Sequence, residues 1–189
     1  CGRGRPPGLH TAVDLGAGRR ALSVTAGRIH TCALLDDHSV KCWGNNHSGE
    51  LGLDDQEDRG DGPGEMGDVL GAVNLGNGRH ALAVAAGGAF TCALLDDGGL
   101  KCWGANFRGQ LGQDTSRNIG NGGGFFSSMA RLPAIALGAG RTVRAVFPGD
   151  DHTCAVLDDW TMKCWGANSN GQLGDGEPVQ SVGTRRGQM

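Results

Sequence analysis

The feature that most constrains this chain is an internal repeat. Three segments, residues 16–52, 76–112 and 138–174, align with one another without a gap. Their central cysteines, Cys32, Cys92 and Cys154, are spaced 60 and then 62 residues apart. A repeated unit of this size usually cannot bury its hydrophobic face alone and is stabilised by stacking on its neighbours. The sequence therefore predicts one repeat domain built from three similar units.

Each unit has the pattern of short β-strands. Residues 20–26 alternate in polarity, and residues 30–35 and 39–43 flank an Asp-Asp turn that predicts a hairpin. In the second unit Gly98 follows this turn, in a position that favours the left-handed backbone region. The other units have His38 and Trp160 there, and a bulky residue in that conformation costs about 1 kcal/mol. We expect a fourth strand in each spacer, at 71–75 and 132–137, which gives the four-stranded unit typical of a propeller blade.

The composition supports turn-rich β structure and argues against two classes of partner, nucleic acids and membranes. The 189 residues include 36 glycines, which disfavour a mainly helical fold. The net charge of -3 provides no basic surface for nucleic acid, and no apolar run approaches the roughly 18 residues needed to span a bilayer. We therefore expect neither nucleic-acid binding nor membrane insertion. The first residue is Cys1 and not Met, which indicates either a removed signal peptide or a piece of a longer polypeptide.

The cysteines fall at matching places in the predicted hairpins. Counting back from the turn puts Cys32 opposite Cys42 in a pair whose Cα atoms lie about 4.5 Å apart, which is within reach of a disulfide. The same register gives three pairs and leaves Cys1 over: Cys32–Cys42, Cys92–Cys102 and Cys154–Cys164. Reduced buried pairs and metal sites stay open as alternatives, although the spacing differs from that of a zinc knuckle. Disulfides would place the chain in an extracellular or other oxidising compartment, and reduced thiols would place it in the cytoplasm or nucleus.

Other repeated side chains favour structural roles. His30 and His152 lie near the cysteines, but the second unit has Phe90 at this position, so a packed side chain is favoured over a metal ligand. We expect the tryptophans and the glycines after them to pack between blades, the asparagines to form Asx-type turns and the lysines to extend toward solvent. These residues are Trp43, Trp103, Trp165, Gly44, Gly104, Gly166, Asn46, Asn106, Asn168, Lys41, Lys101 and Lys163.

The spacers between the units differ in sequence and are the candidate binding loops. Residues 53–75 are acidic and contain Asp54, Asp55 and Asp58, whereas residues 113–137 are glycine-rich and contain Phe125 and Phe126. A calcium loop starting at Asp54 would have an arginine where its turn glycine belongs, so a solvated loop is favoured over a cation site. No nucleophile and base recur in a catalytic pattern. We therefore predict no enzyme activity, no catalytic or metal-binding residue and no cofactor.

The repeated pattern resembles the regulator-of-chromosome-condensation (RCC) repeat in a variant with paired cysteines. In the first unit it is carried by Gly27, His30, Leu34, Trp43, Gly44, Asn46, Gly49, Leu51 and Gly52, with counterparts in the other two units. The resemblance implies an all-β fold in which each repeat forms a β-propeller blade, and the family builds seven-bladed rings. Three blades cannot close a ring, so we expect an incomplete three-blade arc. Its parts would be a tail of a preceding spacer (1–14), repeat 1 (15–75), repeat 2 (76–137) and repeat 3 (138–189), together forming one domain.

The resemblance also frames the function. Members of the family act as a nucleotide-exchange factor, as ubiquitin-ligase modules and as a photoreceptor, and most of them bind proteins through loops on a propeller face. We hypothesise a non-catalytic protein-interaction scaffold with a protein partner. The alternatives are a guanine-nucleotide exchange factor for a small GTPase and an extracellular structural or lectin-like module. The photoreceptor motif Gly-Trp-Arg-His-Thr is absent, since residues 27–31 lack tryptophan. Open blade edges also favour self-association.

Overall fold

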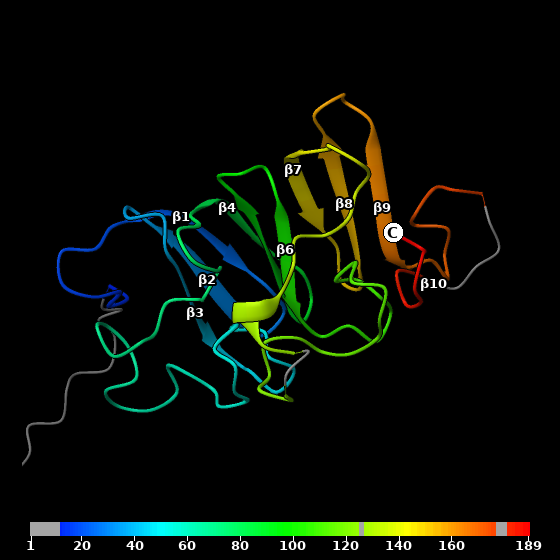
Figure 1. Cartoon of the computed structure of the whole chain (residues 1–189). Coiled ribbons are helices and arrows are strands. Elements are labelled where there is room, and N and C mark those ends of the chain that lie inside the picture. Colours follow the sequence, from blue (N-terminus) through cyan, green and yellow to red (C-terminus); the bar gives the residue numbers. More distant parts are fainter. Residues whose placement is uncertain (1–11, 125–126, 177–180) are drawn as a thin grey trace, which may run out of the picture.

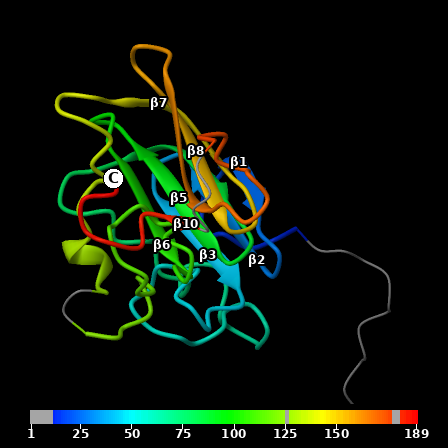
Figure 2. The same cartoon turned by 90° about the vertical axis from the view of Figure 1, so that its right-hand side faces the viewer.

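Three antiparallel sheets stand side by side in chain order (Figure 1). The computed structural model describes residues 12–124, 127–176 and 181–189. Blade 1 contains β1 (Ala21–Ala26), β2 (His30–Leu35) and β3 (Val40–Gly44). Blade 2 contains β4 (Ala81–Ala86), β5 (Phe90–Leu95) and β6 (Leu100–Gly104), and blade 3 contains β7 (Val143–Pro148), β8 (His152–Leu157), β9 (Met162–Ala167) and β10 (Ser181–Val182). In the described part of the chain the only helix is the 3-10 turn η1 (Met129–Arg131). The all-β prediction is confirmed, and the three sheets do not close into a ring (Figure 2).

The inner turns of the three blades meet one another. The amide of Arg28 in blade 1 donates to the carbonyl of Gly88 in blade 2 at 2.9 Å, and the amide of Gly88 donates to the carbonyl of Asp150 in blade 3 at 3.1 Å. The side chains of Arg28 and Asp150 also form an ion pair. The blades therefore spread outward from a shared inner edge, as blades do around a propeller axis.

The hairpin register places the paired cysteines opposite each other. Cys32 is the Cα partner of Cys42, and the same register recurs in blades 2 and 3. All three pairs are disulfides, with Cα–Cα distances of 4.1, 4.0 and 4.1 Å. The predicted pairing is thus confirmed within each blade, and Cys1 lies outside the described residues.

Among the described residues a fourth strand forms only in blade 3, and it lies at a different place from the one predicted. Residues 71–75 and 132–137 are not strands, and the prediction for them is wrong. Their apolar alternation reflects side chains that are buried against a blade edge, among them Val73 and Ile135. The position beside the third strand is instead taken by Arg59, by Ile119 and, in blade 3, by β10.

The hairpin tips adopt the expected left-handed backbone. The φ angles are 62° at His38, 77° at Gly98 and 66° at Trp160. Trp160 is 76% exposed, and the guanidinium of Arg144 lies 4.6 Å from the centre of its ring. A cation–π contact therefore accompanies the one tryptophan that occupies this strained position.

The core lies between the blades. Each sheet has a leading face, directed to the preceding blade, and a trailing face, directed to the next one. Trp103 and Thr91 lie on the leading face of blade 2, and the Cys32–Cys42 disulfide lies on the trailing face of blade 1, where the sulfur of Cys32 is 3.6 Å from the hydroxyl of Thr91. Burial therefore depends on having a neighbour, as expected for a repeat protein.

Candidate interaction surface

A two-donor contact joins each blade to the next. The backbone carbonyl of Glu50 in blade 1 accepts hydrogen bonds from the hydroxyl of Thr91 and from the indole Nε1 of Trp103, both at 3.0 Å. The same contact recurs one blade later, where the carbonyl of Gln110 accepts from Thr153 at 2.8 Å and from Trp165 at 2.9 Å. We call this contact the Trp–Thr clasp. Because each clasp satisfies buried polar groups on both blades, it fixes the position of one blade on the next.

The repeated asparagines support the turn that presents the accepting carbonyl. The side-chain oxygen of Asn46 accepts the amide of Leu51 at 3.0 Å, and Asn106 and Asn168 accept the amides of Leu111 and Leu173 in the same way. All three asparagines are buried. They therefore stabilise the turn itself.

His30 lies inside the contact between blades 1 and 2. Its Nε2 is 2.8 Å from the hydroxyl of Thr91, which already donates its single hydrogen to Glu50. Nε2 must therefore carry the proton of the ring, and Nδ1 is a buried acceptor with no hydrogen-bond partner among the residues that the structure describes. Burial lowers the pKa of His30 to about 4. The neutral ring fills the place that Phe90 fills in blade 2.

The prediction that the repeated lysines extend toward solvent is wrong for two of the three. Lys41 and Lys101 are buried, and Nζ of Lys41 donates to the carbonyls of Leu15 at 3.0 Å and Gly67 at 2.8 Å. Nζ of Lys101 donates to the carbonyl of Leu75 at 2.8 Å, and burial lowers the pKa of this lysine. These two lysines therefore tie backbone segments to the blade and do not extend toward solvent. Only Lys163 is exposed as expected.

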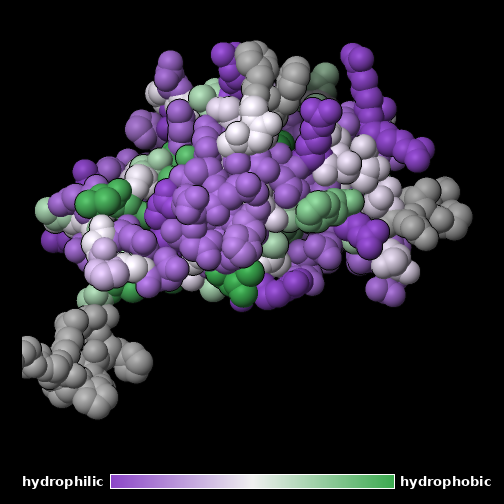
Figure 3. Space-filling view, turned by 90° about the horizontal axis from the view of Figure 1, so that it is seen from below, coloured by the Kyte–Doolittle hydropathy of each residue, from purple (hydrophilic) through white to green (hydrophobic). Residues whose placement is uncertain are grey.

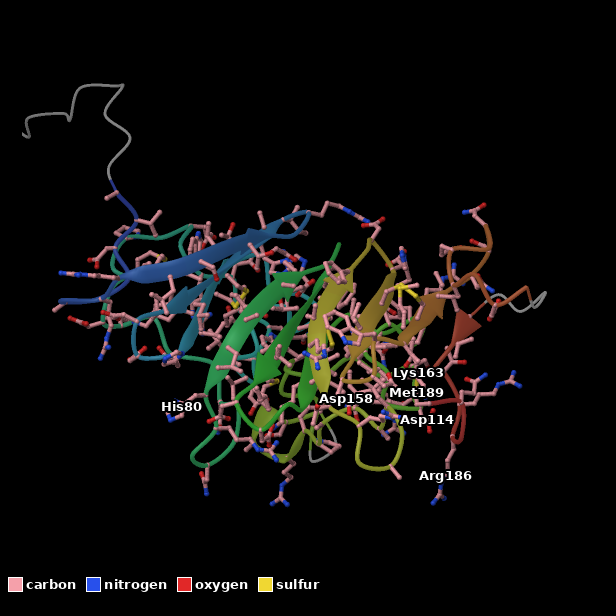
Figure 4. All side chains as sticks on the ribbon, turned by 90° about the horizontal axis from the view of Figure 1, so that it is seen from above. His80, Asp114, Asp158, Lys163, Arg186 and Met189 are labelled. Carbon is pink, nitrogen blue, oxygen red and sulfur yellow. A yellow bond between two sulfur atoms is a disulfide. The ribbon has the colours of Figure 1, made fainter. Side chains whose placement is uncertain are left out.

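Asp54 ties the second spacer to blade 1. One carboxylate oxygen of Asp54 accepts the amide of Met129 at 2.8 Å, and the other accepts the hydroxyl of Ser128 at 2.9 Å. Asp114, which sequence reasoning missed, holds the C-terminal segment in the same way, through the amides of Gly187 and Gln188 (Figure 4). The two aspartates occupy the same place in successive repeats and share a left-handed backbone. Because Asp54 and Asp114 align in the repeat, a comparison of the units could have identified Asp114 from the sequence.

The other acidic candidates are also engaged within their loop. Asp55 forms an ion pair with Arg59 at 2.6 Å and accepts the side-chain amide of Asn46 at 2.8 Å. Asp58 accepts the backbone amide of Asn46 at 2.8 Å. Within residues 12–124, 127–176 and 181–189, no group of three or more His, Cys, Asp or Glu side chains could hold a metal ion. Phe125 and Phe126, the remaining candidates, lie outside the described residues.

The second spacer forms a groove that the sequence did not predict. Its volume is about 730 Å³, and its lining consists of Gln113, Thr115, Arg117, Ile119, Arg131, Leu132 and Pro133. Ile119 and Leu132 are buried and form an apolar floor, whereas Arg117 and Arg131 are exposed at the rim. Seen from below, the molecule is mainly hydrophilic, with hydrophobic side chains only in separate patches (Figure 3). An apolar floor with a cationic rim suits an extended segment that carries negative charge.

The three stacked sheets, joined by Trp–Thr clasps, are arranged as an array of β-propeller blades. Residues 22–50, 81–110 and 143–172 match the family described as "Regulator of chromosome condensation (RCC1) repeat". These three segments are therefore RCC1-type repeats, as the repeated pattern indicated. No helix among the described residues is long and apolar enough to cross a membrane.

Related proteins carry the same repeats within longer chains. The ultraviolet-B receptor UVR8 of Arabidopsis thaliana is 32% identical over 87% of this chain, which covers 33% of the receptor. The probable E3 ubiquitin-protein ligase HERC4 of Homo sapiens is 29% identical over 87% of this chain, which covers 14% of the ligase. The chain thus spans about a third or less of these relatives.

Solved structures show the same fold. Human WBSCR16 superposes with a TM-score of 0.66 at 24% identity, with 88% of this chain and 38% of that chain covered. Yeast RCC1 (Prp20), solved bound to Kap60, superposes with a TM-score of 0.59 at 23% identity, with 82% of this chain and 31% of that chain covered. These likenesses support the propeller-blade architecture and leave the partner to be found by experiment.

Proposed function

We propose that this chain is a non-catalytic protein-interaction scaffold that binds an extended, acidic segment of a partner protein in the groove of its second spacer. One observation carries the proposal: the groove between residues 113–119 and 131–133 combines a buried apolar floor with two arginines at its rim. Arginine binds carboxylates through paired donors, so the groove favours acidic side chains next to apolar ones.

A difference between the two spacers supports this proposal. The carboxylates of Asp54, Asp55 and Asp58 in the first spacer are engaged with the protein itself. In the groove of the second spacer, Ile119 and Leu132 are buried, whereas the side chains of Arg117 and Arg131 are exposed at the rim. The second spacer is therefore the better candidate for partner binding. Nucleotide exchange on a small GTPase and a lectin-like role stay untested hypotheses, because no particular residue favours either of them.

A peptide-display experiment tests the proposal. A library of random peptides panned on the wild-type chain is expected to enrich acidic sequences that contain apolar residues. Arg117→Glu reverses the charge at the rim and is expected to weaken binding of the enriched peptides about tenfold or more. Arg108→Glu is the matched control, because Arg108 is exposed and does not line the groove. Equal binding by wild type and Arg117→Glu, or enrichment of peptides without acidic residues, would contradict the proposal.

A further inference from the structure

The two spacers begin with loops that share one backbone framework. In the second spacer, the backbone amide of Asn106 donates to Oδ1 of Asn118 at 3.1 Å. In the first spacer, the backbone amide of Asn46 donates to Oδ1 of Asp58 at 2.8 Å. A second bond, from the side-chain amide of the same asparagine to a loop carbonyl, also occurs in both units. The loop at 113–119 can therefore be compared with its counterpart position by position.

The charge carried by this shared framework is reversed between the two spacers. Glu57 in the first loop aligns with Arg117 in the second, and both side chains are exposed. Asp58 aligns with Asn118, so the oxygen that accepts the backbone amide is kept, while the other side-chain atom changes from an acceptor to a donor. The one acid of the second loop, Asp114, is engaged with two backbone amides of the C-terminal segment. The second loop therefore presents donors and positive charge where the first presents acceptors and negative charge.

These donors line a hollow that is distinct from the groove. Its volume is about 420 Å³, and its wall includes Phe107, Ser116, Arg117, Asn118 and Asn121. Each asparagine uses its side-chain oxygen within the loop, at 3.1 Å from a backbone amide, and neither side-chain nitrogen has a hydrogen-bond partner among the described residues. Arg117 forms no ion pair in the described part of the chain. None of the described residues in this wall is acidic, so the hollow offers unused donors to a ligand that accepts.

On the basis of the function proposed for the groove, we infer that the hollow binds the phosphate of a phosphorylated serine or threonine in the acidic partner segment. Arg117 lies in the wall of both the groove and the hollow, so one extended segment reaches both. A phosphate has three acceptor oxygens and close to two negative charges, which suits a guanidinium and two amide donors better than a carboxylate does.

The hollow favours a phosphate that is carried by a peptide over a free phosphate ion. Its donors belong to exposed or half-buried side chains, for which water competes. A segment already held in the groove places its phosphate at the hollow at a high effective concentration. The ring of Phe107, which is 68% exposed in the wall of the hollow, offers an apolar contact to the residue beside the phosphate.

Exchanges of asparagine for aspartate test the hollow and keep the loop. Asn118→Asp retains the oxygen that accepts the amide of Asn106, as Asp58 does in blade 1, and replaces the donor by a negatively charged acceptor. Asn121→Asp makes the same exchange at a second position. Asn74→Asp is the matched control, because the exposed Asn74 also accepts a backbone amide, at 3.0 Å, and lines neither the groove nor the hollow.

A peptide array with phosphoserine fixed at the centre of random acidic and apolar sequences is probed with the full chain. The sequences that bind best are then synthesised with phosphoserine or serine at the centre, and their Kd values are measured by fluorescence polarisation. The wild type and Asn74→Asp are expected to bind the phosphoserine forms at least about tenfold more tightly than the serine forms. Asn118→Asp and Asn121→Asp are each expected to lower this ratio at least about fivefold.

Equal affinity of the wild type for the two forms would overturn the inference, and so would a ratio that both hollow variants leave unchanged. Arg131→Glu separates this result from a failure of the groove, because Arg131 lines the groove and not the hollow. It is expected to weaken both peptide forms alike and to keep their ratio. Serine forms that bind Arg131→Glu as well as the wild type would count against the groove alone.

Discussion

At the scale of the residue, His30 makes folding depend on pH. Burial lowers its pKa from 6.5 to about 4, so the unfolded chain takes up a proton at a higher pH than the folded chain does. The contribution of His30 to stability is therefore intact above pH 6.5 and is lost as the pH falls toward 4. At pH 5 the loss amounts to about 2 kcal/mol in the free energy of unfolding.

The variant His30→Phe isolates this effect, because blade 2 already holds Phe90 in the same packing position. We expect the variant to lose stability less steeply than the wild type between pH 6.5 and 4, as measured by urea unfolding at a series of pH values. The comparison concerns the slope, since the lost hydrogen bond to Thr91 shifts the variant by a constant amount. Parallel curves for the two proteins would show that the ring is protonated without cost in the folded state.

At the scale of the element, Asp54 docks the second spacer onto blade 1. Asp54→Ala removes the acceptor of Ser128 and Met129 and leaves alanine at a φ of 59°. We expect a loss of about 3 kcal/mol in the free energy of unfolding, measured by thermal or denaturant melts. Asp54→Asn keeps an acceptor and tolerates this backbone, so it is expected to lose about 1 kcal/mol.

Glu57→Ala is the control for this prediction, because Glu57 belongs to the same acidic spacer and is exposed. It is expected to leave stability unchanged. If Asp54→Ala and Glu57→Ala behaved alike, the acidic residues would act together as a charged surface, and the docking role of Asp54 would be wrong.

The elements also show which features a sequence can reveal. The hairpins and disulfides were predictable because the turn fixes the register, and the register fixes which cysteines face each other. The strands expected at 71–75 and 132–137 were wrong because burial of Val73 or Ile135 against a neighbouring edge produces the same apolar pattern as strand pairing. The spacer groove was not predictable, since it depends on the fold of a loop that places Arg117 and Arg131 at the rim of one groove.

At the scale of the whole molecule, burial is uneven along the array. The disulfides of blades 1 and 2 are covered by the following blade and are fully buried, whereas Cys154 and Cys164 are partly exposed on the trailing face of blade 3. The same difference separates Val40 and Leu100, which are buried, from Met162, which is exposed. The third blade is thus the one whose covalent link can be reached by reagents from solution.

A mild reductant is therefore expected to open Cys154–Cys164 before the other two disulfides, as followed by alkylation and mass spectrometry of the peptides. Exposure decides this order, because thiol–disulfide exchange needs access to a sulfur atom. Reduction in a different order would contradict the exposure argument.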